Sequence, residues 1–318
     1  MSEVEIPESW REALEVVARE GGLYLVLGGT DTGKSTFCRL AVEAVRNAGK
    51  VAGLVDGDIG QSQYGLPGTV FGLRWEGEER RTVATFFVGT TSPREAALQC
   101  LAGICRVTAA VRGGAAHAVM VDTTGYVRGP GAIELKQAKV AALRPREGGV
   151  VLIQREGEAE PIVQAGARGG IRVLRLECPA AVVVRSREQR RERRRQRFAR
   201  YFLKGRPHSF RCAEKRLYTG GLAAFETWLP RESGNLSAAE RGLLLQQLLV
   251  RHPGLLVGLC DGSGELGGLG LLTVLDATSG QAEMFTPVEA GGYEGIQLGL
   301  IRLSRDGEEV GRVEGYGG

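Results

Sequence analysis

The chain has few of the residues that metal sites and histidine-based catalysis require. Its 318 residues include only three histidines, which are scattered, and six cysteines, which form no C-x-x-C pair. Isolated cysteines of this kind favour reduced thiols over a disulfide framework or a zinc site. We therefore expect no structural metal and a chemistry that does not depend on histidine.

Long apolar runs are also missing. The first residues, Met1 to Glu5, are acidic, and no run long enough for a signal peptide or a membrane span follows them. We expect a cytoplasmic protein without a membrane segment. A hydrophobic content of 43% and a charged content of 25% are those of an ordinary globular protein, and the length favours two domains over one.

The most informative stretch runs from Gly28 to Thr36 and has the spacing G-x-x-x-x-G-K-[ST]. An apolar run at residues 23–27 precedes it and a helix-like segment follows, so a strand leads into a glycine turn that opens a helix. Such a turn points backbone N–H groups at phosphate oxygens, and the helix dipole adds to the attraction. Lys34 would reach the β- and γ-phosphates, and Ser35 would contact Mg²⁺. The predicted nucleotide-binding residues are Gly28, Thr30, Asp31, Thr32, Gly33, Lys34, Ser35 and Thr36.

Three carboxylates follow predicted buried strands. Asp56 and Asp58 end the apolar run at residues 51–55, and Asp122 ends the run at residues 118–121. The carboxyl ends of strands face the ligand crevice of an open α/β sheet, so these side chains should lie near the phosphates. Asp122 also opens an Asp-x-x-Gly pattern that positions magnesium in many P-loop proteins. All three aspartates are therefore candidate metal ligands, together with Ser35.

Strand and helix patterns alternate through the first part of the chain, which predicts a mostly parallel sheet flanked by helices, a P-loop α/β fold. Ser92, Pro93 and Glu95 form a capping-box pattern, which predicts a helix from Pro93 to about Arg112, although a substrate-binding loop fits the same residues. Beyond residue 206, short strand-like runs divided by glycines and one helix over 238–250 predict a smaller β-rich domain with a structural or docking role. The predicted division is an N-terminal helix (1–20), a P-loop core (21–184), an arginine-rich lid helix (185–205) and a β-rich C-terminal domain (206–318).

The basic character of the chain is confined to one segment. Residues 185–200 hold nine arginines and two glutamates, a net charge of +7, which leaves −3 for the rest of a chain whose total is +4. The guanidinium group binds two phosphate oxygens at once, so an anionic partner is expected. The guanine-recognition pattern of GTPases is missing from the sequence. An arginine helix directly after a P-loop core suits a phosphotransferase, because a lid must exclude water and stabilise the transferring phosphate.

These motifs resemble a known family, the P-loop polynucleotide 5′-hydroxyl kinases related to the RNA kinase subunit of the cleavage-and-polyadenylation factor and to the ribosomal-RNA-processing kinases. The matching motifs are the P-loop at 30–36, Asp-x-Asp-x-Gly-Gln at 56–61, Thr-Ser-Pro at 91–93, Thr-x-Gly-aromatic ending at Tyr126, and the arginine segment followed by Tyr201-Phe202. The resemblance implies Mg²⁺-dependent transfer of the γ-phosphate of ATP to the 5′-hydroxyl of a single-stranded RNA or DNA.

The resemblance also implies roles for individual residues. Lys34 and the lid residues Arg190 and Arg194 would act on the transferring phosphate, and either Asp56 or Asp58 would accept the proton of the 5′-hydroxyl. The implied nucleic-acid contacts are Gln61, Thr91, Ser92, Thr124, Gly125, Tyr126, Arg185 and Arg197.

The sequence departs from the family in two places. The family usually has tryptophan where this chain has Tyr126, and tyrosine keeps a flat face for stacking on a base. The eukaryotic members carry an additional N-terminal β domain, whereas about twenty residues precede the P-loop strand here, so contacts through that domain are not transferred. Two rival functions stay open at this point: an ATP-binding scaffold without catalysis, and a nucleotide switch or small-molecule kinase.

Overall fold

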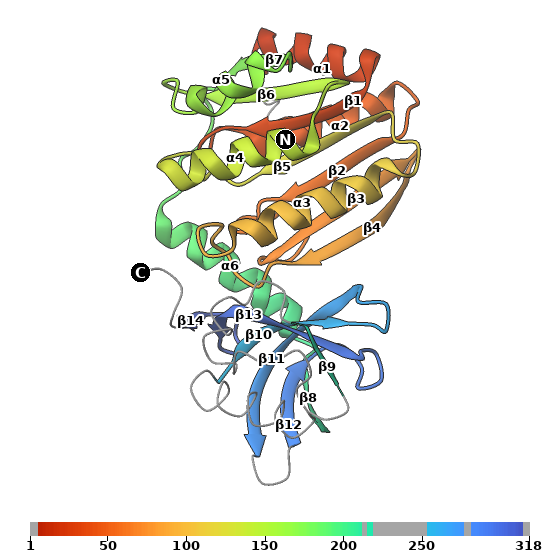
Figure 1. Ribbon diagram of the computed structural model, residues 1–318, viewed down its shortest axis with the longest axis vertical. Coiled ribbons are helices and arrows are strands. Elements are labelled where there is room, and N and C mark those ends of the chain that lie inside the picture. Colours follow the sequence, from red (N-terminus) through yellow and green to blue (C-terminus); the bar gives the residue numbers. More distant parts are fainter. Residues whose placement is uncertain (1–5, 212–214, 219–252, 277–280, 314–318) are drawn as a thin grey trace. The chain divides into compact units, whose positions relative to one another are not determined.

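The structure is a computed structural model that describes residues 6–211, 215–218, 253–276 and 281–313 (Figure 1). The chain forms two compact units, and each is built from more than one segment. The first unit comprises Met1–Gly65, Thr69–Phe86 and Cys100–Arg187, and the second comprises Leu66–Gly68, Phe87–Gln99 and Glu188–Gly318. Two short segments from within the predicted P-loop core thus group with the second unit.

The first unit is built on a seven-stranded sheet with the order β4-β3-β2-β5-β1-β6-β7. Its strands are β1 (Gly22–Leu27), β2 (Ala52–Gly57), β3 (Thr69–Glu76), β4 (Glu79–Phe87), β5 (Ala118–Thr123), β6 (Gly148–Gln154) and β7 (Val173–Glu177). The five strands from β2 to β7 in this order pair in parallel, and β3 joins β2 antiparallel. The predicted mostly parallel P-loop sheet is therefore confirmed.

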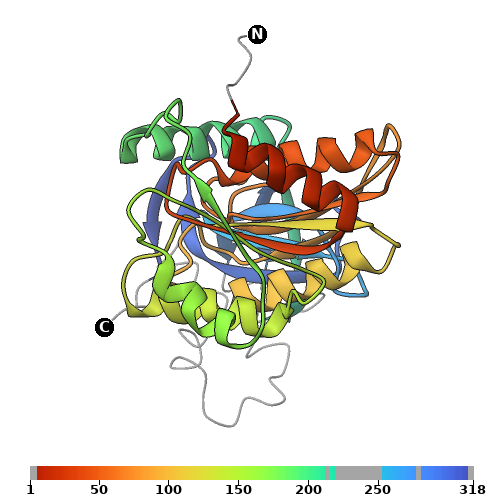
Figure 2. The same cartoon turned by 90° about the horizontal axis from the view of Figure 1, so that it is seen from above.

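Helices cover both faces of this sheet, as Figure 2 shows. Helices α1 (Glu8–Glu20) and α2 (Lys34–Asn47) lie on one face, and α3 (Ala97–Arg112), α4 (Pro130–Leu143) and α5 (Glu160–Arg168) lie on the other. The core under α1 and α2 includes Trp10 and Phe37, whose rings meet edge to face at 5.3 Å. Covering both faces explains why the central strands read as continuous apolar runs rather than alternating ones.

One local prediction needs correction. The helix expected to open at Pro93 begins at Ala97. The Glu95 carboxylate accepts a hydrogen bond from the Thr90 hydroxyl at 2.6 Å and pairs with Arg312, so it does not cap a helix.

The second unit is a β domain that carries the arginine-rich helix α6 (Arg187–Phe202). Its sheet has the order β14-β13-β10-β11-β12-β8, with β9 paired to β13. The strands are β8 (Arg206–Arg211), β9 (Arg216–Tyr218), β10 (Leu255–Cys260), β11 (Leu266–Asp276), β12 (Gln281–Thr286), β13 (Gly295–Leu303) and β14 (Glu309–Arg312). The smaller β-rich C-terminal region expected from the sequence is confirmed, and its strands pair antiparallel except for β9, which pairs with β13 in parallel. The helix predicted over 238–250 lies outside the described residues.

The last two turns of α6 are anchored in the apolar core of the second unit. Phe198 and Phe202 are buried there against strand residues such as Leu256 and Ile301. The Tyr201 hydroxyl accepts a hydrogen bond from the backbone N–H of Leu269 at 2.7 Å. Helix α6 is therefore fixed at its carboxyl end, whereas its arginines begin at the other end.

Within the described residues, no helix combines the length and the apolarity needed to cross a membrane.

Candidate nucleotide and metal site

The predicted P-loop joins β1 to α2 in the strand–turn–helix arrangement that phosphate binding requires. Gly33 precedes the helix with a φ of 94°, and a Cβ there would lie 3.0 Å from the Trp10 ring. A Cβ on Gly28 would lie 2.0 Å from the carbonyl oxygen of Ile153. Both positions therefore need glycine, one for its backbone angle and the other for the close approach of β6.

Lys34 is 5% exposed and its ammonium lies within the loop. The Nζ atom donates to the carbonyl oxygen of Gly29 at 2.5 Å, and the Thr32 hydroxyl donates to the same carbonyl at 3.1 Å. The loop is also held from outside, because the Arg185 guanidinium pairs with the Asp31 carboxylate at 3.1 Å. Arg155 donates to the backbone carbonyl of Asp31 at 2.5 Å. The lysine ammonium thus lies inside the loop, and two arginines brace the loop around it.

Asp56 and Asp122 lie opposite one another on the neighbouring parallel strands β2 and β5. They are 2% and 4% exposed. One oxygen of Asp56 accepts hydrogen bonds from the Ser62 hydroxyl and from the backbone N–H groups of Gln63 and Tyr64, at 2.8, 2.8 and 2.9 Å. The Ser35 hydroxyl donates to Asp122. The P-loop serine and the two buried carboxylates therefore belong to one cluster.

Burial shapes the charge of this cluster. Loss of hydration raises the pKa of Asp122 to about 7, and the neighbouring Asp56 carboxylate adds to the rise. The pKa of Asp56 is also raised, again mainly by burial, although its three hydrogen bonds oppose the change. Two adjacent carboxyl groups whose charged forms are disfavoured are typical of a cation-binding site, because a bound cation offsets their negative charge.

The donor set fits Mg²⁺. The Oδ1 atoms of Asp56 and Asp122 are both buried without a hydrogen-bond partner among the described residues. Carboxylate and hydroxyl oxygens are the ligands that this hard cation prefers, and it usually keeps several waters and substrate phosphates in addition. Such a site needs few protein ligands.

Asp58 lies just beyond the end of β2 and is only partly buried. Its Oδ1 atom accepts from the backbone N–H groups of Gly60 and Gln61, at 3.1 and 3.0 Å. These bonds fix the orientation of the carboxyl group, and lower burial makes Asp58 more accessible than Asp56. The side chain of Gln61 donates to the carbonyl of Gly60 at 2.8 Å.

The segment after β5 is pressed against the P-loop. A Cβ on Gly125 would lie 2.6 Å from the Cα of Thr30, so only glycine permits this approach. Behind it, the fully buried Lys136 donates to the Thr123 hydroxyl at 2.8 Å and to the carbonyl of Thr124 at 2.6 Å. Tyr126 follows at the start of the loop to α4 and is partly exposed.

The remaining predicted site residues belong to the second unit. Thr91 and Ser92 lie in the segment Phe87–Gln99, and Arg190, Arg194 and Arg197 lie in α6. The predicted set is thus divided: the P-loop, the aspartates, Gln61, Thr124 to Tyr126 and Arg185 are in the first unit. The assignment of each residue to substrate stays a prediction.

Sequence reasoning did not find Lys136 or Arg155. Lys136 occupies a helix whose pattern looks ordinary, and nothing local indicates that its ammonium is buried beside Thr123 and Thr124. Arg155 follows β6, at the same edge of the sheet as the P-loop, and this edge position was the one available signal.

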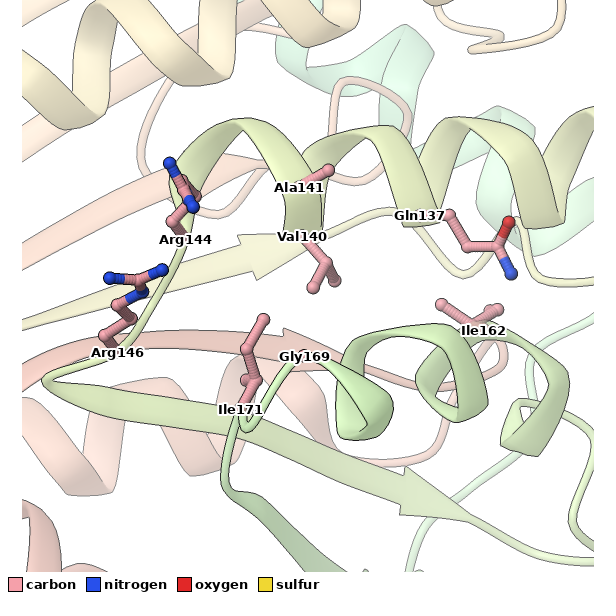
Figure 3. Close-up of a pocket in the computed structure, with 8 residues that line it drawn as sticks. All are labelled: Gln137, Val140, Ala141, Arg144, Arg146, Ile162, Gly169 and Ile171. Carbon is pink, nitrogen blue, oxygen red and sulfur yellow. The ribbon is translucent and has the colours of Figure 1, made fainter.

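A hollow of about 470 Å³ in the first unit lies away from this site (Figure 3). It is lined by Gln137, Val140, Ala141, Arg144, Arg146, Ile162, Gly169 and Ile171. Arg146 and Ile171 precede β6 and β7, so the hollow lies at the amino ends of strands whose carboxyl ends face the P-loop. It has neither carboxylate nor nucleophile and offers no chemistry of its own.

Comparison with known proteins identifies a family and several relatives of this chain. Residues 28–204 match the protein family described as "mRNA cleavage and polyadenylation factor CLP1 P-loop". The polyribonucleotide 5′-hydroxyl-kinase of Thermococcus kodakarensis is 29% identical over 96% of this chain and 96% of its own length. The enzyme of the same name from Methanocaldococcus jannaschii is 25% identical over 98% of this chain and 95% of its own.

Similarity extends to a eukaryotic relative and to a solved structure. The polyribonucleotide 5′-hydroxyl-kinase Clp1 of Danio rerio is 28% identical over 67% of this chain and 52% of its own length. Clp1p in its solved complex with Pcf11p matches 92% of this chain and 78% of its own with a TM-score of 0.66 at 12% identity, which shows a shared fold.

Proposed function

The chain belongs to the family described as mRNA cleavage and polyadenylation factor CLP1 P-loop, and from this premise we propose that it is a polyribonucleotide 5′-hydroxyl kinase. It transfers the γ-phosphate of ATP to the 5′-hydroxyl end of a single-stranded RNA. The names of relatives that align over nearly the whole chain support this proposal. The expected compartment is the cytoplasm.

The observation that carries the proposal is the cluster beside the P-loop. Lys34, Ser35 and two buried carboxylates with unpartnered oxygens lie together where β1, β2 and β5 end. A protein that only bound ATP as a scaffold would have no need to bury two carboxylates at the cost of their raised pKa values. This arrangement supports phosphoryl transfer.

The residues of the first unit divide the work as follows. Lys34 and the loop N–H groups bind and orient the phosphates of ATP. Ser35, Asp56 and Asp122 would hold Mg²⁺, which neutralises charge on the phosphates when bound. Asp58 accepts the proton of the 5′-hydroxyl during in-line attack, because it is the accessible member of the Asp56 and Asp58 pair and two backbone N–H groups orient it.

Other residues handle the nucleic acid and the transferring phosphate. Tyr126 stacks on the terminal base, and Gln61 and Ser92 contact the first phosphate of the strand. Arg190 and Arg194 stabilise charge on the transferring group, as arginines do in related phosphotransferases. Arg197, Thr124 and Gly125 complete the predicted contacts, and Arg185 acts near the nucleotide through Asp31.

The test is transfer of labelled γ-phosphate from ATP to a 5′-hydroxyl RNA oligomer, run beside the DNA oligomer of the same sequence. Lys34→Ala should lose roughly 10²–10³-fold in kcat. Lys204→Ala removes an exposed lysine of the second unit and serves as the matched control, with unchanged activity expected. ATP binding without transfer to either oligomer would favour the alternative function, an ATP-binding scaffold without catalysis.

A further inference from the structure

The Thr-Ser-Pro loop, residues 89–95, is joined to the β domain of the second unit by its backbone. The carbonyl of Gly89 accepts from the N–H of Leu300 on β13 at 2.8 Å. Gly89 has a φ of 79°, and a Cβ on it would lie 2.7 Å from the Cα of Gly299. The loop and β13 therefore approach as closely as two backbones without side chains allow.

Two side chains of β14 hold the same loop. Glu309 accepts from the Thr91 hydroxyl at 3.2 Å, across 218 positions of the sequence. Arg312 donates to Glu309 at 2.9 Å and pairs with Glu95, which in turn accepts from Thr90 at 2.6 Å. The Glu309 and Glu95 side chains are only 17% and 15% exposed, whereas their shared partner Arg312 is 49% exposed.

The turn that precedes β14 contacts helix α6. Arg191 donates to the Glu308 carboxylate at 3.0 Å and to the backbone carbonyl of Glu309 at 3.3 Å. Gly307 has a φ of 82°, and a Cβ on it would lie 2.4 Å from the carbonyl oxygen of Arg195. Arg194 lines the small cleft between this turn and the helix. The turn thus lies directly against the part of α6 that carries the predicted catalytic arginines.

We propose that the hairpin of β13 and β14 is a positioning element that fixes the Thr-Ser-Pro loop and helix α6 to one another, with Glu309 as its central residue. The inference rests on the proposed function, in which the loop contacts RNA and the helix contacts the transferring phosphate. Glu309 serves both, since its carboxylate accepts from Thr91 and its backbone carbonyl accepts from Arg191.

The contact with Glu309 also gives Thr91 a defined part. Its hydroxyl hydrogen is directed at a carboxylate, so it is not available for a phosphate oxygen of the strand. Thr91 therefore holds the loop in shape, and Ser92 is left as the hydroxyl that contacts the strand. The β domain, expected from the sequence to have a structural or docking role, then takes part in presenting the substrate.

The test compares two threonine–glutamate pairs of the second unit in the full chain. Glu309→Ala should raise KM for RNA about tenfold and leave KM for ATP unchanged. Glu309→Gln should restore most of the loss, because the amide oxygen still accepts from Thr91. Glu283 accepts from the Thr273 hydroxyl at 3.1 Å on β11 and β12, so Glu283→Ala is the matched control and should leave both KM values unchanged.

Amide hydrogen exchange provides a readout that does not need activity. Glu309→Ala removes the Thr91 contact and should speed exchange in residues 89–95. Glu308→Ala removes the ion pair with Arg191 and should speed exchange in the first half of α6, and Glu283→Ala should do neither. The proposal is overturned if the RNA KM of Glu309→Ala stays within twofold, if Glu283→Ala raises it equally, or if either hairpin variant leaves exchange in its segment unchanged. A wild-type protein that fails to phosphorylate RNA would refute the proposed function instead, and the exchange measurement would still decide on the hairpin.

Discussion

Charged side chains have different surroundings in the two units. In the first unit, Lys34, Asp56, Asp122 and Lys136 are all 5% exposed or less. In the second unit, the ion pairs of α6 stand at the surface, and the pair of Arg195 with Glu192 is 38% and 46% exposed. The second unit instead buries the aromatic rings of the same helix.

The two units therefore differ in how much free energy of folding their charged side chains cost. Burying an ionised group costs free energy unless it is fully paired, whereas an exposed arginine costs little and contributes little. We therefore expect the buried charges beside the P-loop, Lys34, Asp56 and Asp122, to mark the site of chemistry. We expect the arginines of α6 to form a surface that can meet an anionic substrate at small cost in stability.

The largest expected effect comes from Asp122→Asn. It should lower kcat by at least roughly 10²-fold, because it removes a candidate metal ligand. It should also stabilise the protein in the presence of a chelator at pH 8. The native state keeps Asp122 protonated up to a pKa of about 7, whereas the unfolded chain releases this proton near 3.8. Stability is therefore lost as pH rises through this window.

Equilibrium unfolding in urea at pH 4 and pH 8 measures this effect. The gain from Asp122→Asn should be small at pH 4 and on the order of 4 kcal/mol at pH 8. Asp58→Asn should also reduce kcat, because Asp58 is the proposed acceptor of the 5′-hydroxyl proton. An equal gain at both pH values would contradict the account of a buried, protonated Asp122.

A smaller effect should distinguish the two fully buried lysines of α4. Lys136 has three acceptors on Thr123 and Thr124, whereas Lys139 Nζ has no hydrogen-bond partner among the described residues. Burial lowers the pKa of both. Lys139→Met should stabilise the protein by about 1–3 kcal/mol, because it removes an unpaired buried amine. Lys136→Met should destabilise it by a similar amount, because it leaves buried acceptors unpaired.

Urea unfolding of both lysine variants at pH 7 tests this contrast on one helix. Changes of the same sign would show that hydrogen bonding does not decide the cost of a buried lysine here.

The smallest expected effect is that of Arg195→Ala in α6. Arg195 pairs with Glu192 one turn away at 2.8 Å, and both side chains are substantially exposed, so the Tm should change by about 1 °C or less. Phe198→Ala, which removes a buried ring from the same helix, is the positive control and should lower the Tm clearly. A large fall in Tm from Arg195→Ala would contradict the claim that the exposed ion pairs of the second unit contribute little to stability.

Sequence motifs predicted the first unit well where local geometry dictates the residue. A Cβ at Gly28 would clash with a neighbouring carbonyl oxygen, and Gly33 has a positive φ that other residues rarely adopt. Both positions therefore require glycine, so the P-loop could be identified from the spacing of its residues alone. Asp56 and Asp122 could be assigned to one edge of the sheet because parallel strands end together.

Contacts that join distant segments could not be predicted in this way. Glu95 fits a capping box, yet its partner is Arg312 from the other end of the chain, and the helix starts at Ala97. The burial of Lys136 and the contact of Thr91 with Glu309 likewise depend on how elements pack. No local pattern records a partner that tertiary structure supplies.

The most direct test of the central claim uses two RNA oligomers that differ only in the chemical group at the 5′ end. One carries a 5′-hydroxyl, and the other carries a 5′-phosphate but is otherwise identical. With labelled γ-phosphate on ATP and Mg²⁺ present, the account predicts label on the 5′-hydroxyl oligomer alone, recovered as a labelled 5′-terminal nucleotide after nuclease digestion. Label on both oligomers, or on neither while ATP binds, would contradict a 5′-hydroxyl kinase.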